Sequence, residues 1–392
     1  MTQGLRPRTL DVMSSTSPRA DTAVDLVVVG AGIVGLAHAA EALDRGLRVV
    51  VLERDEHAVG ASVRNFGHVC TTAQGGRALD LALVARQTWL DLGRKAGFEV
   101  TEAGTLVLAR AEDEVAVLEE LAAERGAEQV RLLDPAAAAE RSGVDVPDLQ
   151  RAAHLPLDLR VDPREAVPAL ARWLSEAGVG IRFGTHVGEI VPSGDEVLVR
   201  TGRGEVRARH VVHAVGHDVD RLFPSLAEEY AVRRCRLQML EVAPPGDVRI
   251  APALLTGLSM ARYAGLAAMP SADAVAARFA ADAPELLALD VNLMLTQRPD
   301  GSIVLGDTHH RAVTHDAFDE ETDAALLLRE GARLLGAPLT VRRRWRGVYA
   351  SSSRTDFLVA APHPLVRVVS VTSGIGMTTS FGLAPTVLDQ LL

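Results

Sequence analysis

The sequence has little of several residue types that mark particular classes of protein. Its 392 residues include two cysteines, Cys70 and Cys235, which are too few for a disulfide framework, so we expect a reducing cytoplasm. No uninterrupted apolar run approaches the roughly 20 residues of a membrane helix, so no membrane span is expected. The formal net charge of −10 argues against nucleic acid and anionic membranes as partners. Local arginines can still bind a small anion.

The beginning of the chain and its length predict a tail followed by two domains. Residues 1–22 contain arginines but no apolar core region, so they do not read as a signal peptide. We expect a disordered tail there, with Met13 as an alternative to Met1 as the true start. The 392 residues, with 48% hydrophobic and 23% charged, are enough for two domains that each have a core.

The strongest motif lies in residues 24–54, which read as an apolar strand, a glycine turn, a helix and a second apolar strand. Gly30, Gly32 and Gly35 fit G-x-G-x-x-G, which provides a tight turn, a close approach to a pyrophosphate and close helix packing. Glu53 closes the second strand, where an acid can bind ribose hydroxyls and disfavours a 2′-phosphate. The motif therefore predicts FAD or NAD, against the alternative of a structural glycine turn in a nucleotide-free sheet.

Two further stretches favour FAD over NAD. Residues 55–76 form a glycine-rich loop instead of the third strand of an NAD domain, and residues 368–392 read as a strand, a Gly374–Met377 turn and a closing helix. Both stretches resemble the D-amino-acid oxidase and glycine oxidase superfamily of flavoproteins. Residues 159–190 and 208–222 resemble its second nucleotide segment and its later strand and glycine turn. The resemblance covers nearly the whole chain in the right order.

The resemblance implies an α/β fold, with a Rossmann-like FAD-binding domain and a discontinuous α+β substrate domain built on an antiparallel sheet, as in glycine oxidase. We expect the FAD-binding domain in residues 23–95, 155–225 and 341–392, and the substrate domain in residues 96–154 and 226–340. Helical periodicity in residues 76–97 predicts a buried stripe of Leu79, Leu83, Val84 and Leu90.

The resemblance also implies which residues hold the cofactor. Val63 stands where some relatives use a histidine to attach flavin covalently, so noncovalent FAD is expected. Arg64 follows the second strand and can pair with a pyrophosphate or an anionic substrate, or can simply tie its loop to the sheet. The residues expected at FAD are Gly30, Ala31, Gly32, Ile33, Val34, Gly35, Glu53, Arg54, Ala61, Ser62, Arg64, Asn65, Gly67, Val187, Ala214, Gly216, Gly374, Gly376, Met377 and Thr378.

Within the superfamily, residues 62–69, 293–310, 344–350 and 372–384 resemble the flavin oxidoreductases linked to phosphonate catabolism. These resemble glycine oxidase and oxidise 2-aminoethylphosphonate or its N-methyl derivative. The resemblance implies hydride transfer from a small anionic amine to flavin N5 and hydrolysis of the imine to phosphonoacetaldehyde, with no side-chain base required. Oxygen or another acceptor would reoxidise the flavin, and a homo-oligomer is possible.

Two other functions stay open. One keeps the fold and changes the substrate to glycine, sarcosine or a D-amino acid, with an oxo acid as the product. The other is a flavin-binding protein without turnover that serves as a partner or scaffold. Turnover of 2-aminoethylphosphonate against those amino acids separates the first two, and bleaching of the flavin by any amine excludes the third.

The residues expected to bind substrate come from segments that the resemblance brings near the flavin. Their alternatives are ordinary structural roles, such as a surface arginine, a half-buried tyrosine or the polar end of a hairpin. The turn at Asp307, His309 and His310 also suggests a metal, but adjacent strand residues point to opposite faces, so no metal is predicted. The substrate-binding residues are expected to be His68, Arg262, Tyr263, His309, Arg346 and Tyr349.

The chain has a single lysine, Lys95, so nearly all of its basic residues are arginine. A genome-wide codon bias is the simplest cause. Related sarcosine-oxidase-like enzymes place a lysine over the flavin to speed reaction with oxygen. Lys95 lies in a polar turn and is not expected at that position, so the resemblance implies a slow oxidase or a dehydrogenase.

Overall fold

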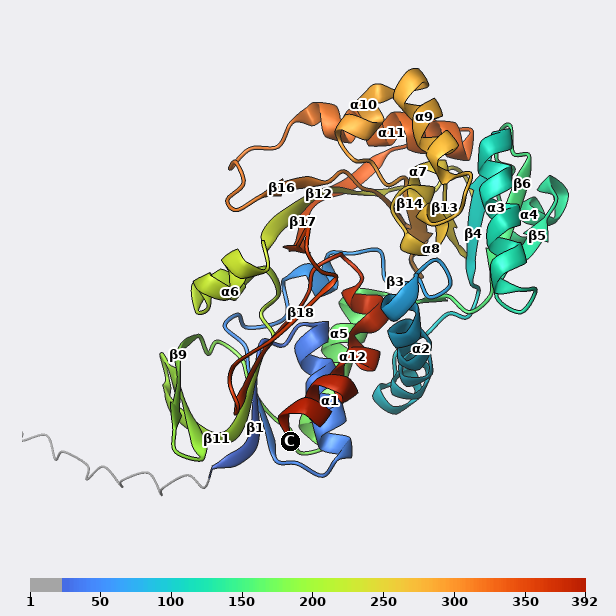
Figure 1. Cartoon of the computed structure of the whole chain (residues 1–392). Helices are drawn as coiled ribbons and strands as arrows, with labels where there is room; N and C mark the ends of the chain where they lie inside the picture. The colour runs from blue at the N-terminus through green and yellow to red at the C-terminus, as the bar shows by residue number, and fades with distance from the viewer. Residues whose placement is uncertain (1–22) are drawn as a thin grey trace, which may run out of the picture.

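The structure is a computed structural model that describes residues 23–392, so the predicted tail of residues 1–22 lies outside the described part (Figure 1). Two large sheets organise these residues, one of eight strands and one of nine. The eight-stranded sheet contains the glycine motif and the C-terminal strands. The nine-stranded sheet is built mainly from the two segments that were predicted to form a substrate domain.

The eight-stranded sheet has a parallel centre in the order β8-β2-β1-β11-β19. Strands β1 and β2 are runs of valine and leucine, as is typical of strands covered on both faces. Strand β18 extends one edge antiparallel to β19, and the hairpin β9–β10 pairs antiparallel with β11. The strands are β1 (Val24–Val29), β2 (Val49–Leu52), β8 (Gly180–Arg182), β9 (Val187–Ser193), β10 (Glu196–Thr201), β11 (Gly204–His213), β18 (Phe357–His363) and β19 (Val366–Val371).

Four helices pack beside this sheet and against one another (Figure 1). The indole of Trp89 is fully buried, lies edge-on to Phe98 and Phe381, and donates from Nε1 to the carbonyl of Met377 at 2.8 Å. This contact fixes α2 to the beginning of α12. The helices are α1 (Ile33–Asp44), α2 (Gly76–Ala96), α5 (Pro163–Glu176) and α12 (Gly376–Leu391).

The predicted stripe of α2 is wrong in part. Leu83 and Val84 are 39% and 54% exposed, whereas Leu81, Trp89 and Leu92 form the buried face. Both faces of this helix carry apolar residues, and the buried one is the face that meets α12. The choice between the two faces is therefore made by a helix almost 300 residues later in the sequence.

The nine-stranded sheet runs in the order β16-β12-β15-β14-β13-β4-β6-β5, with β17 also paired to β12. Its neighbours are antiparallel except for the parallel pair β13 and β4. Its strands are β4 (Thr105–Ala109), β5 (Arg131–Leu133), β6 (Arg151–Leu155), β12 (Arg233–Val242), β13 (Ala253–Leu255), β14 (Met294–Gln297), β15 (Ile303–Gly306), β16 (His310–Ala312) and β17 (Val341–Ser351).

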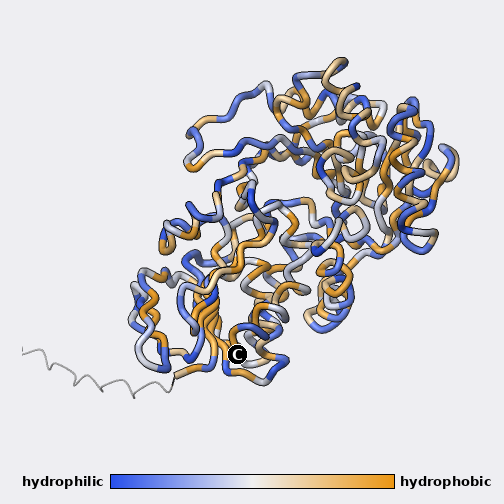
Figure 2. Tube along the Cα trace, in the orientation of Figure 1, coloured by the Kyte–Doolittle hydropathy of each residue, from blue (hydrophilic) through white to orange (hydrophobic). Residues whose placement is uncertain are grey.

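Helices α9, α10 and α11 lie on the side of this second sheet away from the first (Figure 1). Helix α8 lies on the side toward the first sheet, where Gly265 N donates to the carbonyl of Ala73 at 2.8 Å. Figure 2 shows apolar stretches inside both units, which agrees with separate hydrophobic clusters around Leu26 and Leu36 and around Leu240 and Leu305. Within residues 23–392, no helix is long and apolar enough to cross a membrane. The helices are α3 (Glu112–Arg125), α4 (Pro135–Ser142), α7 (Gly257–Met260), α8 (Ala264–Ala267), α9 (Ala272–Asp282), α10 (Pro284–Ala288) and α11 (Glu321–Leu335).

Short elements join the two sheets, and one of them bears on the predicted domain division. Strands β3 (His68–Val69) and β7 (Leu159–Arg160) form a small ladder between the sheets, and α6 (Pro224–Glu229) precedes β12. Strand β17 pairs with β12 along its length, so residues 341–351 belong to the second sheet. The last segment of the proposed FAD-binding domain therefore begins after β17, at residue 352, and not at residue 341.

Candidate functional site

A cavity of about 360 Å³ is lined by residues from both sheets, a size typical of small-molecule sites. The first sheet contributes the glycine turn after β1, Glu53 after β2, and Ala214 and Gly216 after β11. These are the carboxyl ends of neighbouring parallel strands, where open α/β sheets bind ligands. The second sheet contributes Arg262, Asp307 and other polar side chains.

The three glycines of the turn have different steric reasons to be glycine. Gly30 has φ +103°, and an added Cβ would lie 2.6 Å from the carbonyl oxygen of Ala214. At Gly35, an added Cβ would lie 1.9 Å from the oxygen of Gly30, because α1 packs directly on the turn. At Gly32, an added Cβ would meet only Ser62 Oγ at 3.1 Å and would otherwise project toward the cavity. Gly32 therefore keeps space open for a ligand, and this cradle fits a pyrophosphate.

Polar groups around the turn fit the remainder of an adenine dinucleotide. Glu53 Oε2 accepts a hydrogen bond from Ala31 N at 2.8 Å, and Oε1 accepts from Asp55 N at 3.0 Å. A carboxylate has about four lone-pair positions, so acceptor capacity remains for ribose hydroxyls. Ser62 Oγ accepts from Ile33 N at 2.8 Å, which ties the loop after β2 to the beginning of α1.

We expect Glu53→Gln to weaken retention of FAD by roughly 1 to 3 kcal/mol, the usual cost of losing a charged hydrogen-bond acceptor. The amide would also direct N–H groups at a position that now accepts from two backbone N–H groups. Flavin content after extensive dialysis measures the effect. Glu56→Gln is the matched control, because Glu56 lies on the same loop and its side chain is 79% exposed. Equal flavin content in the two variants would reject the role of Glu53.

The other residues predicted at FAD fall into two groups. Most line the cavity, and Arg54 does so while its Nη1 pairs with Asp218 Oδ2 at 2.7 Å. Four lie behind the cavity wall and position it. Gly67, for example, has φ +69° and packs against the carbonyl of Val161. The residues that line the cavity are Gly30, Gly32, Ile33, Val34, Glu53, Arg54, Ala61, Ser62, Arg64, Asn65, Val187, Ala214, Gly216, Gly374, Gly376 and Met377, and those behind it are Ala31, Gly35, Gly67 and Thr378.

The loop before α8 contributes a partly buried cation to the cavity wall. Arg262 Nη1 pairs with Asp290 Oδ2 at 2.9 Å, and the same oxygen accepts from Arg311 Nη2 at 2.7 Å. Burial acts to lower the pKa of Arg262, but Tyr349 and the nearby carboxylates raise it above its usual value. The ring of Tyr349 packs on Gly374, where an added Cβ would lie 3.0 Å from Cζ. Tyr349 therefore adjoins the C-terminal glycine turn, and Arg262 lines both cavities together with it. Tyr263 also lines the cavity.

His309 lines the cavity as expected, but its charge differs from what an anion clamp requires. Its Nδ1 lies 2.8 Å from the carbonyl oxygen of Asp290, so Nδ1 carries the proton and Nε2 is an acceptor. Burial and the charge of Arg262 lower the pKa of His309 to about 3. His309 was expected to bind substrate, and because its ring is neutral with an acceptor at Nε2, it is suited to a donor group of the substrate and not to its anion.

Asp307 lies beside His309, with Oδ2 3.7 Å from His309 Nε2. Burial raises the pKa of this carboxyl to about 7, although Arg262 opposes the shift. His310, the next residue, turns away and places Nε2 2.6 Å from Asp323 on α11. The two adjacent histidines thus contact different partners, His309 the carbonyl of Asp290 and His310 the carboxylate of Asp323.

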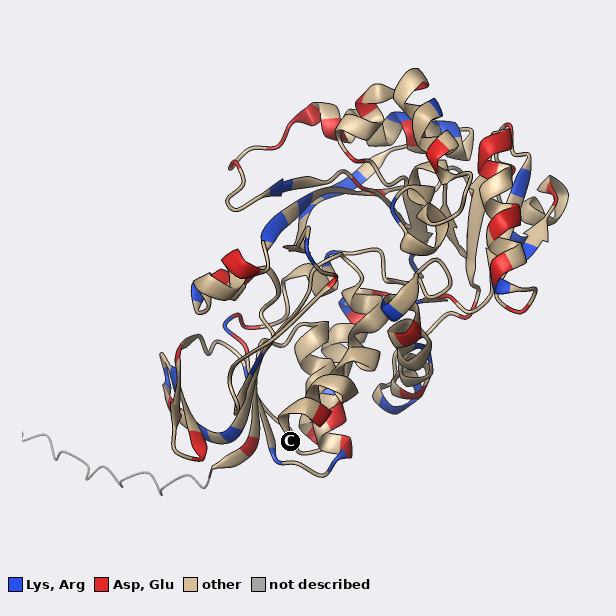
Figure 3. Ribbon diagram, viewed as in Figure 1, with Lys and Arg blue, Asp and Glu red and all other residues tan. Residues whose placement is uncertain are grey.

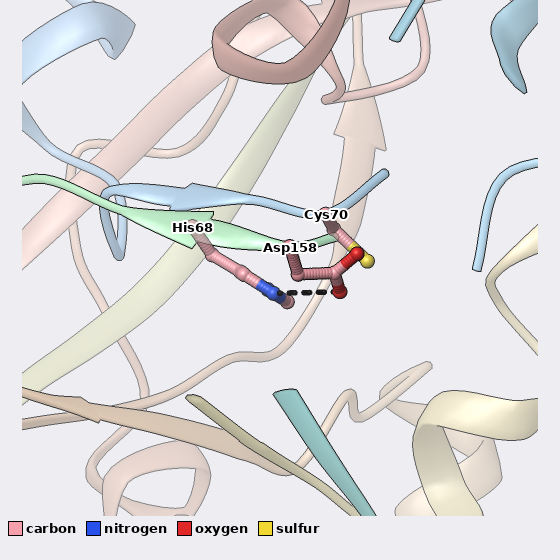
Figure 4. Close-up of side chains that lie close together, drawn as sticks. All are labelled: His68, Cys70 and Asp158. Carbon is pink, nitrogen blue, oxygen red and sulfur yellow. Dashed lines mark ion pairs between the residues drawn. The ribbon is translucent and has the colours of Figure 1, made fainter. Parts of the chain in front are cut away.

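The expectation that His68 binds substrate is corrected, because His68 does not line the cavity. It lies in a buried polar cluster (Figure 4). His68 Nε2 lies 2.6 Å from Thr105 Oγ1, which donates to Asp158 Oδ2 at 2.7 Å. Asp158 Oδ1 accepts from the backbone N–H groups of Thr71 and Thr72 at 2.9 and 2.8 Å. Thr105 lies on β4 of the nine-stranded sheet, and the other residues of the cluster lie on or beside the ladder of β3 and β7.

Cys70 completes this cluster, and potential metal-ligand atoms of Cys70, His68 and Asp158 lie within 4.8 Å of one another. Both oxygens of the carboxylate already accept hydrogen bonds from protein donors. Burial and the charge of Asp158 raise the pKa of the Cys70 thiol well above its usual value, so the thiol stays protonated. This chemistry fits a hydrogen-bonded joint between the sheets better than a metal centre.

Arg346 was also expected to bind substrate, and this expectation is corrected because Arg346 does not line the cavity. Its Nε pairs with Asp319 Oδ2 at 2.6 Å, and its other nitrogens donate to the carbonyls of Asp316 and Ala317. Figure 3 shows the basic residues along β12 and β17, the strands that this arginine and its neighbours occupy. Arg346 thus secures the loop before α11 and faces away from Gly347 and Tyr349, which do line the cavity.

A second, more open cavity of about 320 Å³ adjoins the first and shares Arg262, Tyr349 and Ser373 with it. Its other lining residues include Ala261, Asp290, Arg311 and the hydroxyl residues Ser351, Ser352 and Thr372. The hydroxyls of Ser352 and Thr372 already donate to the carbonyls of Tyr230 and Thr355. Ser373 Oγ is buried and has no hydrogen-bond partner among the described residues. The wall between the two cavities therefore presents several donors suited to an oxyanion.

Comparisons with known proteins agree with this geometry. A family model described as DAO, FAD dependent oxidoreductase, matches residues 25–390. Glycine oxidase from Geobacillus kaustophilus has a similar structure, with a TM-score of 0.75 at 20% identity over 94% of both chains. L-proline dehydrogenase from P. horikoshii has the same TM-score, 0.75, at 20% identity over 94% of this chain and 92% of that chain.

L-α-glycerophosphate oxidase from Mycoplasma pneumoniae, with FAD bound, gives a TM-score of 0.75 at 19% identity over 94% of this chain and 95% of that chain. No curated protein matches the chain. At these identities the likeness establishes the fold. The predicted glycine-oxidase-like α/β fold is therefore confirmed, and so is FAD as the cofactor of the matching family.

Proposed function

Because the chain belongs to the DAO family of FAD-dependent oxidoreductases, we propose that it oxidises a small anionic amine, with 2-aminoethylphosphonate or its N-methyl derivative as the preferred substrate. The observation that carries this proposal is the single wall at which Arg262, Tyr349 and Ser373 meet the Gly374 turn. A partly buried cation beside hydroxyl donors favours an anionic group, and the same cavity continues to the dinucleotide turn.

The proposed reaction uses the chain's residues for orientation. FAD, when bound, supplies the acceptor of the hydride at its N5 atom. Glu53 and the glycine turn would hold the adenine dinucleotide, and Arg262 would hold the acid group of the amine. This clamping leaves the carbon that bears nitrogen with little freedom, which is how a bound geometry replaces a catalytic base. An amine held in this way would be oxidised to an imine, and hydrolysis of the imine would give phosphonoacetaldehyde and ammonia or methylamine.

The donors on the wall favour a phosphonate. A phosphonate has three acceptor oxygens and carries more negative charge than a carboxylate near neutral pH, so it gains more from several convergent donors. Arg262 and Tyr349 face the first cavity, while Arg311, Ser351 and Ser373 extend the donor set into the second. The sequence resemblance in residues 293–310 and 344–350 points to the same substrate class.

A carboxylate substrate is the alternative, and one observation favours it. Arg346 was expected to bind the substrate together with Arg262, but it does not line the cavity. Arg262 alone can grip a carboxylate through its two-pronged guanidinium. Glycine, sarcosine or a D-amino acid would then be oxidised to an oxo acid. The similarity to glycine oxidase is compatible with this choice.

A substrate screen on purified holoprotein tests the proposal. Each amine is mixed anaerobically with the oxidised protein, and bleaching of the yellow flavin band reports hydride transfer without involving any acceptor. We expect 2-aminoethylphosphonate or its N-methyl derivative to bleach the flavin faster than glycine, sarcosine or D-alanine. Faster bleaching by an amino acid would select the alternative. A flavin that no amine bleaches would leave a flavin-binding protein without turnover.

We also expect the reduced flavin to react slowly with oxygen, because no lysine is available at the cavity. Lys95 is exposed, and its Nζ lies 5.8 Å from the ring centroid of Trp173 on the outside of α2 and α5. Stopped-flow mixing of reduced protein with oxygen measures the rate, and an artificial dye acceptor is the control. Reoxidation by the dye should be much the faster of the two. Rapid reoxidation by oxygen would mean that another side chain replaces the lysine.

A further inference from the structure

Asp307 is a buried acid that the proposed reaction does not use. It follows β15, is 4% exposed and lines the cavity together with Asn292 and His309. Its backbone N–H donates to the carbonyl of Asn292 at 2.7 Å and its carbonyl accepts from Asn292 N at 2.9 Å, so its position is fixed. Its Oδ1 is buried and has no hydrogen-bond partner among residues 23–392. A buried carboxyl oxygen without a donor indicates a missing ligand.

The groups around Asp307 define what that ligand must supply. His309 Nε2 lies 3.7 Å from Asp307 Oδ2 and is itself an acceptor, because the ring proton is on Nδ1. The nearest guanidinium, that of Arg262, is paired with Asp290. Asp307 and His309 therefore present two acceptors to one region of the cavity, while Arg262 is ion-paired on the neighbouring wall. The complementary ligand group carries N–H donors and a positive charge.

We propose that Asp307, with His309 beside it, binds the amino group of the substrate and accepts its proton before oxidation. This inference rests on the proposed function and narrows its substrate class to amines that carry N–H and an acid group close together. The substrate ammonium gives one proton to the carboxylate, which yields a neutral amine and a protonated Asp307 and involves no change of oxidation state. Arg262 and Asp307 then form the two poles of one site.

The charge environment supports proton transfer near neutral pH. Burial raises the pKa of Asp307. Arg262 and hydrogen bonds from the Asp307 backbone and the Asn292 side chain oppose the shift, and Asp290 adds to it. The other titratable groups on the surrounding elements are Tyr263 before α8, Cys235 on β12, Tyr349 on β17, and His309 and Arg311 near β16. His309 stays neutral, so no second proton competes at this position.

The pH dependence of folding gives a readout that does not involve activity. In the unfolded chain the Asp307 carboxyl has its ordinary pKa of 3.8, whereas in the folded chain burial raises it to about 7. The folded state therefore keeps a proton that the unfolded state loses, so the contribution of this group to stability falls as pH rises from about 4 to about 7. Asp307→Asn removes that loss. Its melting temperature should exceed that of wild type by more at pH 8 than at pH 5.

A binding experiment tests the proposal on the holoprotein. After reduction with dithionite under anaerobic conditions, the flavin can accept no hydride, so titration calorimetry measures binding of an oxidisable amine without turnover. The ligands are 2-aminoethylphosphonate and ethylphosphonate, which differ only in the amino group. Wild type at pH 8 should prefer the amine by at least about tenfold. Asp307→Asn should lose this preference and keep its affinity for ethylphosphonate within about threefold.

Controls separate this inference from a structural role and from the proposed function. Asp307→Glu should restore much of the preference, Asp300→Asn on an exposed turn should not change it, and Asp307→Ala repeats the test if the asparagine variant does not fold. A preference for the amine that survives in the folded variants, or an equal loss of both ligands, overturns the role of Asp307. Wild type that no amine bleaches instead overturns the proposed function. If glycine is the substrate, glycine and acetate replace the two phosphonates.

Discussion

Gly32→Val is expected to give a folded protein that purifies without flavin colour. The backbone at Gly32 has φ −73° and ψ 173°, an extended conformation that valine adopts readily. Its only near neighbour on the protein side is Ser62 Oγ, at 3.1 Å from an added Cβ. The valine methyl groups would extend into the cavity where the pyrophosphate is expected, so affinity for FAD should fall by at least about 100-fold, or about 2.8 kcal/mol.

The neighbouring glycines make this expectation specific. Gly35→Val should fail for a different reason, because even a Cβ would lie 1.9 Å from the oxygen of Gly30 and α1 could not keep its place. That variant should lose stability as well as flavin. Gly188→Val is the matched control, since Gly188 lies exposed on β9 with open space where a Cβ would be. Circular dichroism reports the fold, and the flavin absorbance per protein reports the cofactor.

A yellow Gly32→Val protein would contradict the assignment of the dinucleotide site. A colourless but unfolded protein would show that Gly32 is needed for folding, which its open surroundings do not suggest. The informative result is the combination of a native circular dichroism spectrum with missing flavin. That combination cannot arise from general destabilisation.

The dinucleotide part of the site could be predicted from the sequence because its signals are local. Gly30, Gly32, Gly35 and Glu53 belong to one strand-turn-helix-strand unit, in which spacing alone fixes which backbone groups meet. Each residue in this unit lies where the spacing implied, either at the cavity or directly behind it. The glycine-oxidase-like fold was predictable for a related reason, since the strand and turn segments occur in a fixed order along the chain.

The substrate part was harder to predict because it depends on side-chain direction and on distant partners. His68 and Arg346 stand in segments that reach the cavity, yet His68 joins Asp158 and Arg346 joins Asp319. Period-2 alternation explains part of this, since adjacent strand residues face opposite sides. Which side faces the cavity depends on pairing with β12, a strand more than 100 residues away from β17. Sequence spacing carries no information about that choice.

Charge state was the least predictable property of the site. His309 was expected to donate to an anion, but the carbonyl of Asp290 and its own burial leave it neutral. Asp307, one of a group of polar residues in the sequence, becomes notable only when its Oδ1 is seen to be buried without a donor. Burial and hydrogen bonding decide both cases, and both are properties of the folded chain. The sequence signal that could have drawn attention to Asp307 was its position directly after a buried strand.

Removing the guanidinium of Arg262 should have the largest effect on catalysis with the flavin still bound. Arg262 contributes a partly buried cation at the wall shared by the two cavities, whereas the other arginines that line the first cavity, Arg54, Arg64 and Arg221, do not line the second. For Arg262→Ala we expect a lower kcat/KM for the preferred acid-bearing amine. The decrease should correspond to a loss of about 2 to 5 kcal/mol in transition-state binding. The flavin should remain bound and reducible by dithionite, because Arg262 lies on the loop before α8, whereas the dinucleotide turn with Gly30, Gly32 and Gly35 follows β1.

Arg346→Ala is the matched control. It shows whether the loss of kcat/KM comes from removing a cavity-lining arginine or from removing any ion-paired arginine. Both side chains are partly buried and ion-paired, but only Arg262 lines the cavity. Arg346→Ala should therefore keep kcat/KM within about threefold of wild type, which is less than 1 kcal/mol. An uncharged primary amine of similar size should lose much less than the acid-bearing amine in Arg262→Ala, because it has no group for the cation to bind. If Arg262→Ala affects the two amines equally, or no more than Arg346→Ala does, the anion is bound elsewhere and the phosphonate proposal loses its physical support.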